Sequence, residues 1–237
     1  MFRPLPGLTI ATLIALAVLI WLGSWQVSRR LEKHQLLDQI ASRQSAPPAP
    51  IEYLFPTGDY AAFRAATARG VFEHTNEVYV FAARTDTGPT LPGFKVITPF
   101  RLLGGDIILV DRGWVSNEQR DPKTRAKGQP AGVVELEGSL RRSSVAAYFT
   151  PPPEPSARIF YVRDSAAIAS LMSVSPKTPL IFEATTKTTG GPLPLPSTID
   201  IPNNHLNYAI TWFSLAIVML IIYLRYHYTI GRLRLRS

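Results

Sequence analysis

Two long uncharged apolar segments, one toward each end of the chain, constrain its fold more than any other feature of the sequence. No charged residue occurs from Pro4 to Ser28 or from Leu206 to Leu224. A helix rises about 1.5 Å per residue, so each segment can cross a hydrocarbon layer roughly 30 Å thick. Because backbone groups in lipid must be satisfied within the segment, both are predicted to be transmembrane helices.

The first segment has an alternative interpretation as a cleaved signal peptide. Its apolar stretch is longer than the usual core of about 7–15 residues. Trp21, Trp25 and Gln26 occupy the positions where the small residues of a cleavage site would stand. We therefore interpret the segment as a retained anchor.

The net charge of +8 comes from the membrane flanks and not from a nucleic-acid-binding surface. Residues 44–204 carry 16 Lys and Arg against 15 Asp and Glu, so the surplus lies beside the apolar segments. Basic flanks of this kind contact anionic lipid headgroups. The sequence has no cysteine, which excludes disulfides, thiolate zinc sites, iron–sulfur clusters and covalent c-type haem attachment.

Charge also predicts the orientation of the chain. Four arginines follow the second segment, and the nearest Lys or Arg before it is Lys187. The positive-inside rule then places both termini in the cytoplasm, although Arg3 before the first segment and "RRLEKH" after it disagree locally. The arginines after the second segment are Arg225, Arg232, Arg234 and Arg236. The predicted organisation is a cytoplasmic N-terminus (1–6), a transmembrane helix (7–27), an extracytoplasmic domain (28–203), a second transmembrane helix (204–224) and a basic cytoplasmic tail (225–237).

The sequence between the apolar segments predicts a domain rich in β-structure. Residues 27–44 continue the first helix outward, and Pro47, Pro48 and Pro50 end it. A short helix is expected over 165–174 with Ser165 as its N-cap, and residues 188–202 form an extended connector. The expected strands lie within 62–74, 76–84, 93–103, 106–115, 133–142, 158–164 and 179–185. The predicted fold class is therefore a membrane protein in which two transmembrane α-helices flank one mainly antiparallel β extramembrane domain, or small barrel, with minor helices.

Common catalytic motifs are absent from the sequence, which argues against an enzyme. There is no glycine-rich phosphate loop, no HExxH and no Gly-x-Ser-x-Gly elbow. None of the histidines at 34, 74, 205 and 227 is spaced three or four residues from another. His74 is predicted to be a solvated turn residue, and His34 and His227 to be interfacial.

A polar loop after "VDRGWV" has two interpretations. In one, Arg112 pairs with Asp111 or another nearby carboxylate, Trp114 caps the core and the loop is solvated. In the other, this loop is a docking surface for a partner or for the bilayer.

The two predicted helices run in opposite directions, so polar residues at their outer ends can meet. Trp25, Gln26 and Arg29 can approach Asn203, Asn204 and the second helix, on which His205, Tyr208 and Trp212 share one side, while Gly23 permits close packing. An imidazole, aromatic faces and arginines suit haem, a flat apolar ring with anionic arms. The alternative is an ordinary interfacial aromatic belt with an Asn-Asn helix cap.

Three motifs, in order, resemble the surfeit-locus protein family of cytochrome c oxidase assembly factors. They are "LGSWQVSRRLEK" after the first segment, "VDRGWV" in the domain and "NNHLNYAITWF" at the second segment. The resemblance covers the whole chain, and the motifs are specific only in combination. It implies an assembly role in which haem a is bound and passed toward oxidase subunit I, with His205 as the axial ligand to the iron. It also implies Trp25, Gln26 and Arg29 as partners of His205.

The expected partners are oxidase subunit I, haem a synthase and membrane lipid, with no nucleic acid. Only six residues precede the apolar run, which favours a bacterial inner membrane, with the main domain periplasmic, over a mitochondrial one. The alternative function is a membrane scaffold that binds the oxidase and contacts no haem.

Overall fold

The computed structural model describes residues 4–85, 89–195 and 204–232. The chain divides into two compact units, one of Met1–Gln39 with Ile199–Ser237 and one of Ile40–Thr198. We call these the helical unit and the β unit. Arg3, Asn203, Arg234 and Arg236, which the sequence analysis singled out, lie outside the described residues.

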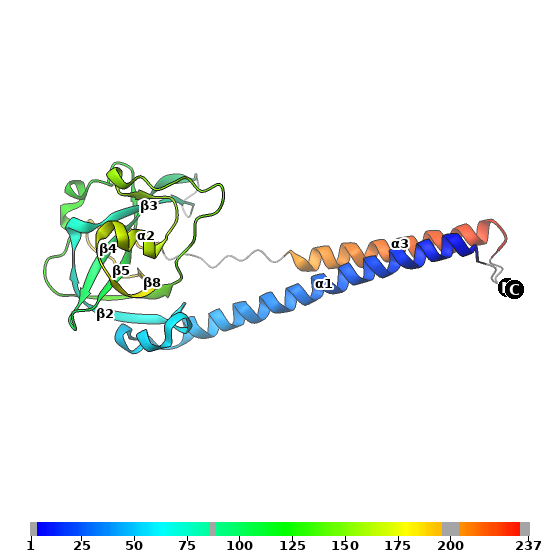
Figure 1. Cartoon of the computed structure of the whole chain (residues 1–237), viewed down its shortest axis with the longest axis horizontal. Helices are drawn as coiled ribbons and strands as arrows, with labels where there is room; N and C mark the ends of the chain where they lie inside the picture. The colour runs from blue at the N-terminus through cyan, green and yellow to red at the C-terminus, as the bar shows by residue number, and fades with distance from the viewer. Residues whose placement is uncertain (1–3, 86–88, 196–203, 233–237) are drawn as a thin grey trace. The chain divides into compact units, whose positions relative to one another are not determined.

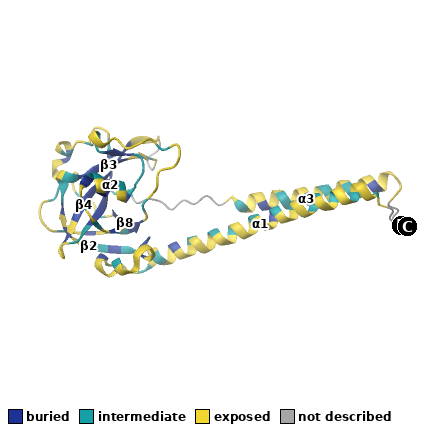
Figure 2. Ribbon diagram, viewed as in Figure 1, coloured by how far each residue is buried: buried dark blue, intermediate teal, exposed yellow. Residues whose placement is uncertain are grey.

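The helical unit is built from α1 (Pro6–Ser45) and α3 (His205–Thr229). Both are long and apolar enough to span a membrane, and most of their residues are exposed (Figure 2). At 40 residues, α1 extends about 60 Å, which is longer than the hydrocarbon layer. The predicted continuation of the first helix through residues 27–44 is confirmed.

The two helices pack along a seam with the period of a coiled coil. Partly or fully covered residues follow one another in alternating steps of four and three along both helices. A Cβ atom at Gly23 would lie 2.7 Å from the Phe213 ring, so glycine permits the close approach that the sequence predicted. The seam positions are 9, 12, 16, 19, 23, 26 and 30 on α1 and 205, 209, 212, 216, 219 and 223 on α3.

Five of the described strands of the β unit close into a barrel (Figure 1). Their order around it is β2–β4–β5–β8–β6, and β6 returns to β2. All neighbours are antiparallel except β5 and β8, which are parallel, so the predicted mainly antiparallel barrel is confirmed. This connectivity resembles the five-stranded Greek-key barrel of OB-folds. The strands are β2 (Ala65–Phe72), β4 (Leu91–Leu102), β5 (Ile107–Ser116), β6 (Val134–Arg141) and β8 (Pro176–Ala184).

Shorter elements surround the barrel. β3 (Val78–Arg84) pairs with the first half of β4, and β7 (Ile159–Phe160) pairs in parallel with β3. β1 (Ala49–Pro50), a parallel partner of β2, was not expected from the sequence. Short 3₁₀ helices complete the unit: η1 (Ile51–Tyr53), η2 (Phe55–Ala61), η3 (His74–Asn76), η4 (Pro122–Gly128) and η5 (Pro155–Ala157).

The apolar core has two main parts. Phe100 and Phe182 are fully buried in the cluster that fills the barrel. α2 (Ser165–Met172) covers a second cluster, into which it inserts Ile168 and Met172. The sequence predicted this helix but named the wrong cap: Asp164, not Ser165, accepts hydrogen bonds from the backbone N–H groups of Ala166 and Ala167. A carboxylate at this position also interacts favourably with the helix dipole.

Candidate functional site

At one end of the seam, His205 of α3 meets Gln26 of α1. The His205 Nδ1 atom lies 2.7 Å from Gln26 Oε1. The seam period places both residues on the facing sides of their helices, since Gln26 follows Gly23 by three residues and His205 precedes Ala209 by four. Asn204 is the N-cap of α3, but its side chain makes no capping hydrogen bond within the described residues.

This hydrogen bond determines which nitrogen of His205 is protonated. An amide oxygen can only accept a hydrogen bond, so Nδ1 must carry the proton and donate it. The lone pair of neutral His205 is therefore on Nε2, the nitrogen that remains available to an electrophile or a metal ion. A ligand histidine is typically oriented in this way, through a hydrogen bond from its other ring nitrogen.

The aromatic residues expected around His205 lie at different distances from the seam. Trp212 is at a seam position and partly buried. Trp25 and Tyr208 are 43% and 55% exposed and lie beside the seam, where lipid or a bound molecule could reach them. The structure thus brings Gln26 and His205 into contact, and it leaves the side chains of Trp25 and Tyr208 exposed beside that contact.

Arg29 lies one turn beyond Gln26. Its guanidinium pairs with Glu32 at 2.7 Å and stands 5.7 Å from the centre of the Trp25 ring. The pair is solvent-exposed, and exposed ion pairs of this kind contribute about 0–1 kcal/mol. Arg29 can therefore exchange Glu32 for another anion at little cost.

At the other end of the seam, a second polar contact joins the two helices. The Leu5 N–H donates to His227 Nε2 at 3.3 Å, and His227 Nδ1–H donates to the Tyr223 carbonyl at 3.0 Å. The Thr9 and Tyr223 hydroxyls lie 2.6 Å apart. His227, predicted to be interfacial, is fully buried between the two helices, and its ring accepts the Leu5 N–H at the start of α1. His34 is exposed.

The β unit contains a buried cluster of charged side chains that the sequence analysis missed. Lys95 Nζ lies 3.0 Å from Asp111 Oδ2 and 2.7 Å from Glu183 Oε1, and Arg141 Nε lies 2.9 Å from Glu183 Oε2. Arg163 lies 3.6 Å from both carboxylates. These residues come from five separate segments, four of them strands, and it is strand pairing, which aligns Asp111 with Glu183, that brings the two carboxylates together.

Comparison with known proteins places the chain in a family. A model of the SURF1 family matches residues 13–217, which is most of the sequence. The chain belongs to the SURF1 family. It is 33% identical over 226 residues to a SURF1-like protein of Monosiga brevicollis, covering 90% of this chain and 85% of that protein. It is 32% identical to surfeit locus protein 1 of Xenopus tropicalis and of Homo sapiens, in each case over 82% of this chain and over 67% and 69% of those proteins.

Membership of the SURF1 family supports the role in cytochrome c oxidase assembly that the three motifs implied. It also favours an assembly protein over an enzyme. The relatives named above are eukaryotic, so a bacterial origin of the chain stays a prediction.

The second SURF1-family motif forms a buried polar cluster around Arg112. Arg112 donates to the Gly128 carbonyl and to His74 Nδ1, the latter at 3.3 Å, and lies 4.6 Å from the centre of the Phe72 ring. The predicted pairing of Arg112 with Asp111 was therefore wrong, since Asp111 faces Lys95. Burial lowers the pKa of Arg112 to about 10.

His74 belongs to the same cluster and is not the solvated turn residue that the sequence suggested. Its Nε2–H donates to the Pro130 carbonyl at 3.0 Å, while Nδ1 accepts from Arg112. Burial is the main cause that lowers the pKa of His74, and the charge of Arg112 acts in the same direction. His74 is thus held neutral between two protein groups, which explains why a histidine can lie beside an arginine.

The polar loop after the motif is only partly solvated. Arg125 is buried and donates hydrogen bonds to the Glu77 carboxylate and, at 3.0 Å, to the Gln119 carbonyl. Trp114 is buried as predicted, and its indole N–H donates to the Ala82 carbonyl at 3.1 Å. The loop is therefore tied down at its centre by an internal ion pair.

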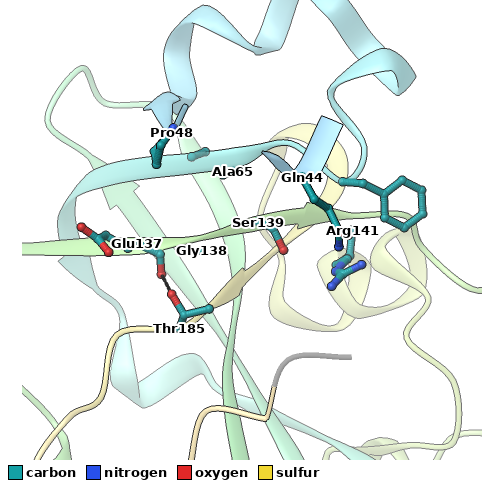
Figure 3. A pocket seen from close by; sticks show the side chains of 10 residues that line it. Gln44, Pro48, Ala65, Glu137, Gly138, Ser139, Arg141 and Thr185 are labelled. Carbon is teal, nitrogen blue, oxygen red and sulfur yellow. Dashed lines mark hydrogen bonds between the residues drawn. The ribbon is translucent and has the colours of Figure 1, made fainter. Parts of the chain in front are cut away.

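A hollow of about 330 Å³ lies on the β unit over β2 and β6. Figure 3 shows Gln44 and Arg141 side by side at one end and Glu137 and Thr185 at the other. Thr185 Oγ1 donates to the Glu137 carbonyl at 3.0 Å. Since Arg141 is also bound to Glu183, the buried ion cluster fixes one wall of this hollow.

Proposed function

We propose that this chain is a cytochrome c oxidase assembly factor that binds haem a as cargo and assists its delivery to, or insertion into, subunit I. Its family supports the oxidase-assembly role, and the contact between His205 and Gln26 supports the haem site. That contact is the single observation on which the haem proposal depends. When the imidazole is neutral, this contact places the ring's lone pair on Nε2, and it holds the ring in one orientation.

In this proposal, the residues at the end of the seam have separate roles. His205 Nε2 is the axial ligand to the haem iron, and Gln26 holds the imidazole. Trp25, Tyr208 and Trp212 supply aromatic faces for the macrocycle. Arg29 exchanges Glu32 for a propionate, which suits its bidentate guanidinium.

A single protein ligand suits a cargo that must be released. Within the described residues no group of three or more His, Asp or Glu side chains could hold a metal ion, so His205 is proposed as the one ligand from this chain. The other face of the iron is then left for the receiving protein. Oxidase subunit I and haem a synthase are the proposed partners.

The proposed orientation follows from charge. Both termini are placed in the cytoplasm because arginines follow the second apolar segment. The β unit and the outer end of the seam, with His205, then lie on the opposite side. For a bacterial chain that side is the periplasm.

The test is the visible spectrum of full-length protein purified from cells that do, or do not, make haem a. We expect a haem band only in the first case. His205→Ala should weaken it, and His205→Met should shift it, because the axial ligand changes. Gln26→Leu removes the orienting hydrogen bond and should weaken haem affinity about 10- to 100-fold. His34→Ala, an exposed histidine on the same α1 helix, is the matched control and should change nothing.

Two outcomes would count against the proposal in different ways. Colourless protein that still co-purifies with oxidase subunits would favour the scaffold function without haem. A haem band that neither the His205 nor the Gln26 variants alter would place the haem elsewhere in the chain.

A further inference from the structure

Two aromatic side chains stand almost fully exposed between β6 and β7. Tyr148 and Phe149 are 94% and 91% exposed, and Val145 nearby is 85% exposed. The two rings pack edge to face with their centres 5.0 Å apart. We call these three residues the aromatic tip. Large apolar side chains gathered on a surface usually mark a contact site.

The backbone holds the aromatic tip in a closed turn. The Thr150 N–H donates to the Ala147 carbonyl at 2.9 Å, and the Ala147 N–H donates to Thr150 Oγ1 at 2.9 Å. Tyr148 and Phe149 are therefore the two central residues of a turn, the positions that project farthest from the chain.

Both sides of the turn are anchored to the β unit. Before it, the Ser144 N–H donates to the Arg163 carbonyl at 2.9 Å. After it come three consecutive prolines, Pro151–Pro153, whose fixed φ stiffens the chain, and then Glu154, which bridges Ile159. The exposed aromatics are thus presented on a pre-ordered support, so little conformational entropy is lost when they bind.

The size of the aromatic tip favours a lipid surface over a protein. A stable protein interface buries about 800 Å² on each partner and uses about 20–30 residues. The aromatic tip is confined to one turn, and no acidic residue occurs from Arg142 to Pro153. Aromatic residues concentrate at membrane–water interfaces, and the exposed Arg142 suits anionic headgroups.

The helices of the chain keep the β unit close to a bilayer. α1 and α3 lead into the β unit from both of its ends, so a membrane that they span is tethered to the aromatic tip. Tethering gives the second contact an effective concentration in the millimolar range for short linkers, so even a weak contact is populated. A small apolar tip is then sufficient.

We propose that the aromatic tip inserts Tyr148 and Phe149 into the interfacial layer of the bilayer that α1 and α3 span. The β unit then has a third attachment to the membrane, which restricts its orientation. This inference depends on membrane anchoring and not on haem binding, so the two proposals can fail separately.

The absence of cysteine from the sequence makes a spin-label test direct. Ala147→Cys places one label beside the intact aromatic pair, in full-length protein reconstituted into vesicles of phosphatidylglycerol and phosphatidylcholine. Thr75→Cys, at an exposed position of the same unit, is the aqueous reference, and Ala17→Cys on the exposed face of α1 is the lipid reference. We measure collisions of each label with oxygen and with a water-soluble nickel chelate.

The label at position 147 should collide severalfold less with the nickel chelate than the label at position 75. Adding Tyr148→Ser and Phe149→Ser to Ala147→Cys should restore the aqueous value. A label at 147 as accessible as the aqueous reference would overturn the proposal, whether or not the serine variant folds. Protection that develops only after purified oxidase is added would also overturn it and would assign the tip to a protein partner.

Discussion

Replacing the buried residue Glu183 should lower the stability of the β unit more than most single substitutions would. Glu183 is 2% exposed. It accepts hydrogen bonds from Lys95 at 2.7 Å and Arg141 at 2.9 Å, and Arg163 forms a longer ion pair with it at 3.6 Å. Glu183→Ala removes the carboxylate that Lys95, Arg141 and Arg163 share, while Asp111 still pairs with Lys95 and Arg163. Breaking a buried pair by removing one partner typically costs about 3–5 kcal/mol. Domains of about 150–250 residues lose about 2–4 °C in Tm per kcal/mol, so we expect a loss of roughly 6–20 °C.

The measurement is thermal unfolding of the full-length protein in detergent, followed by circular dichroism. Glu73→Ala is the matched control, because it removes a carboxylate from an exposed pair with Arg101 at 2.6 Å. An exposed pair contributes about 0–1 kcal/mol, so this variant should melt within a few degrees of the wild type. Glu183→Gln, which keeps the shape but not the charge, should fall between the two. Equal melting temperatures for the two alanine variants would refute the importance of the buried cluster.

The other predictions concern single residues with defined contacts. Burial lowers the pKa of His74 below its usual 6.5, so its contribution to stability is complete above about pH 6.5 and is lost as the pH falls toward the folded-state pKa. The free energy of unfolding of the wild type, measured with urea, should therefore fall between pH 7 and pH 5. His74→Gln should make this free energy less dependent on pH, whereas His34→Gln, at an exposed position, should not. Gly113→Ala should unfold the β unit or lower its Tm strongly, because φ is +115° and a Cβ would lie 2.2 Å from the Leu193 carbonyl oxygen; a normal melting curve would contradict this geometry. Tyr223→Phe removes the hydroxyl that lies 2.6 Å from Thr9 and should cost about 0.5–1.5 kcal/mol of helix association, measured by unfolding in mild detergent; no change would mean that lipid or water replaces the contact.

The sequence by itself determined the two long helices, the short helix α2, the strands other than β1, and the order of these elements. A long uncharged apolar segment must satisfy its own backbone hydrogen bonds when it lies in lipid, so both long helices could be predicted. The prolines at 47, 48 and 50 likewise predicted the end of α1 near Ser45. Segments rich in β-branched and aromatic residues, bounded by turn residues such as the glycines of "GGD", likewise predicted the strands of the barrel. Antiparallel helices with facing polar ends also predicted that residues near Gln26 and His205 could approach.

Only the tertiary structure decided which polar groups meet. Sequence proximity suggested Asp111 for Arg112, whereas strand pairing turned alternate side chains to opposite faces and gave Asp111 to Lys95 and Arg112 to His74. The burial of His227 depends on the register in which the two helices pack, and the local sequence does not predict that register. Charges and hydrogen bonds between distant segments depend on how the barrel closes and how the helices align, and those are properties of the whole fold.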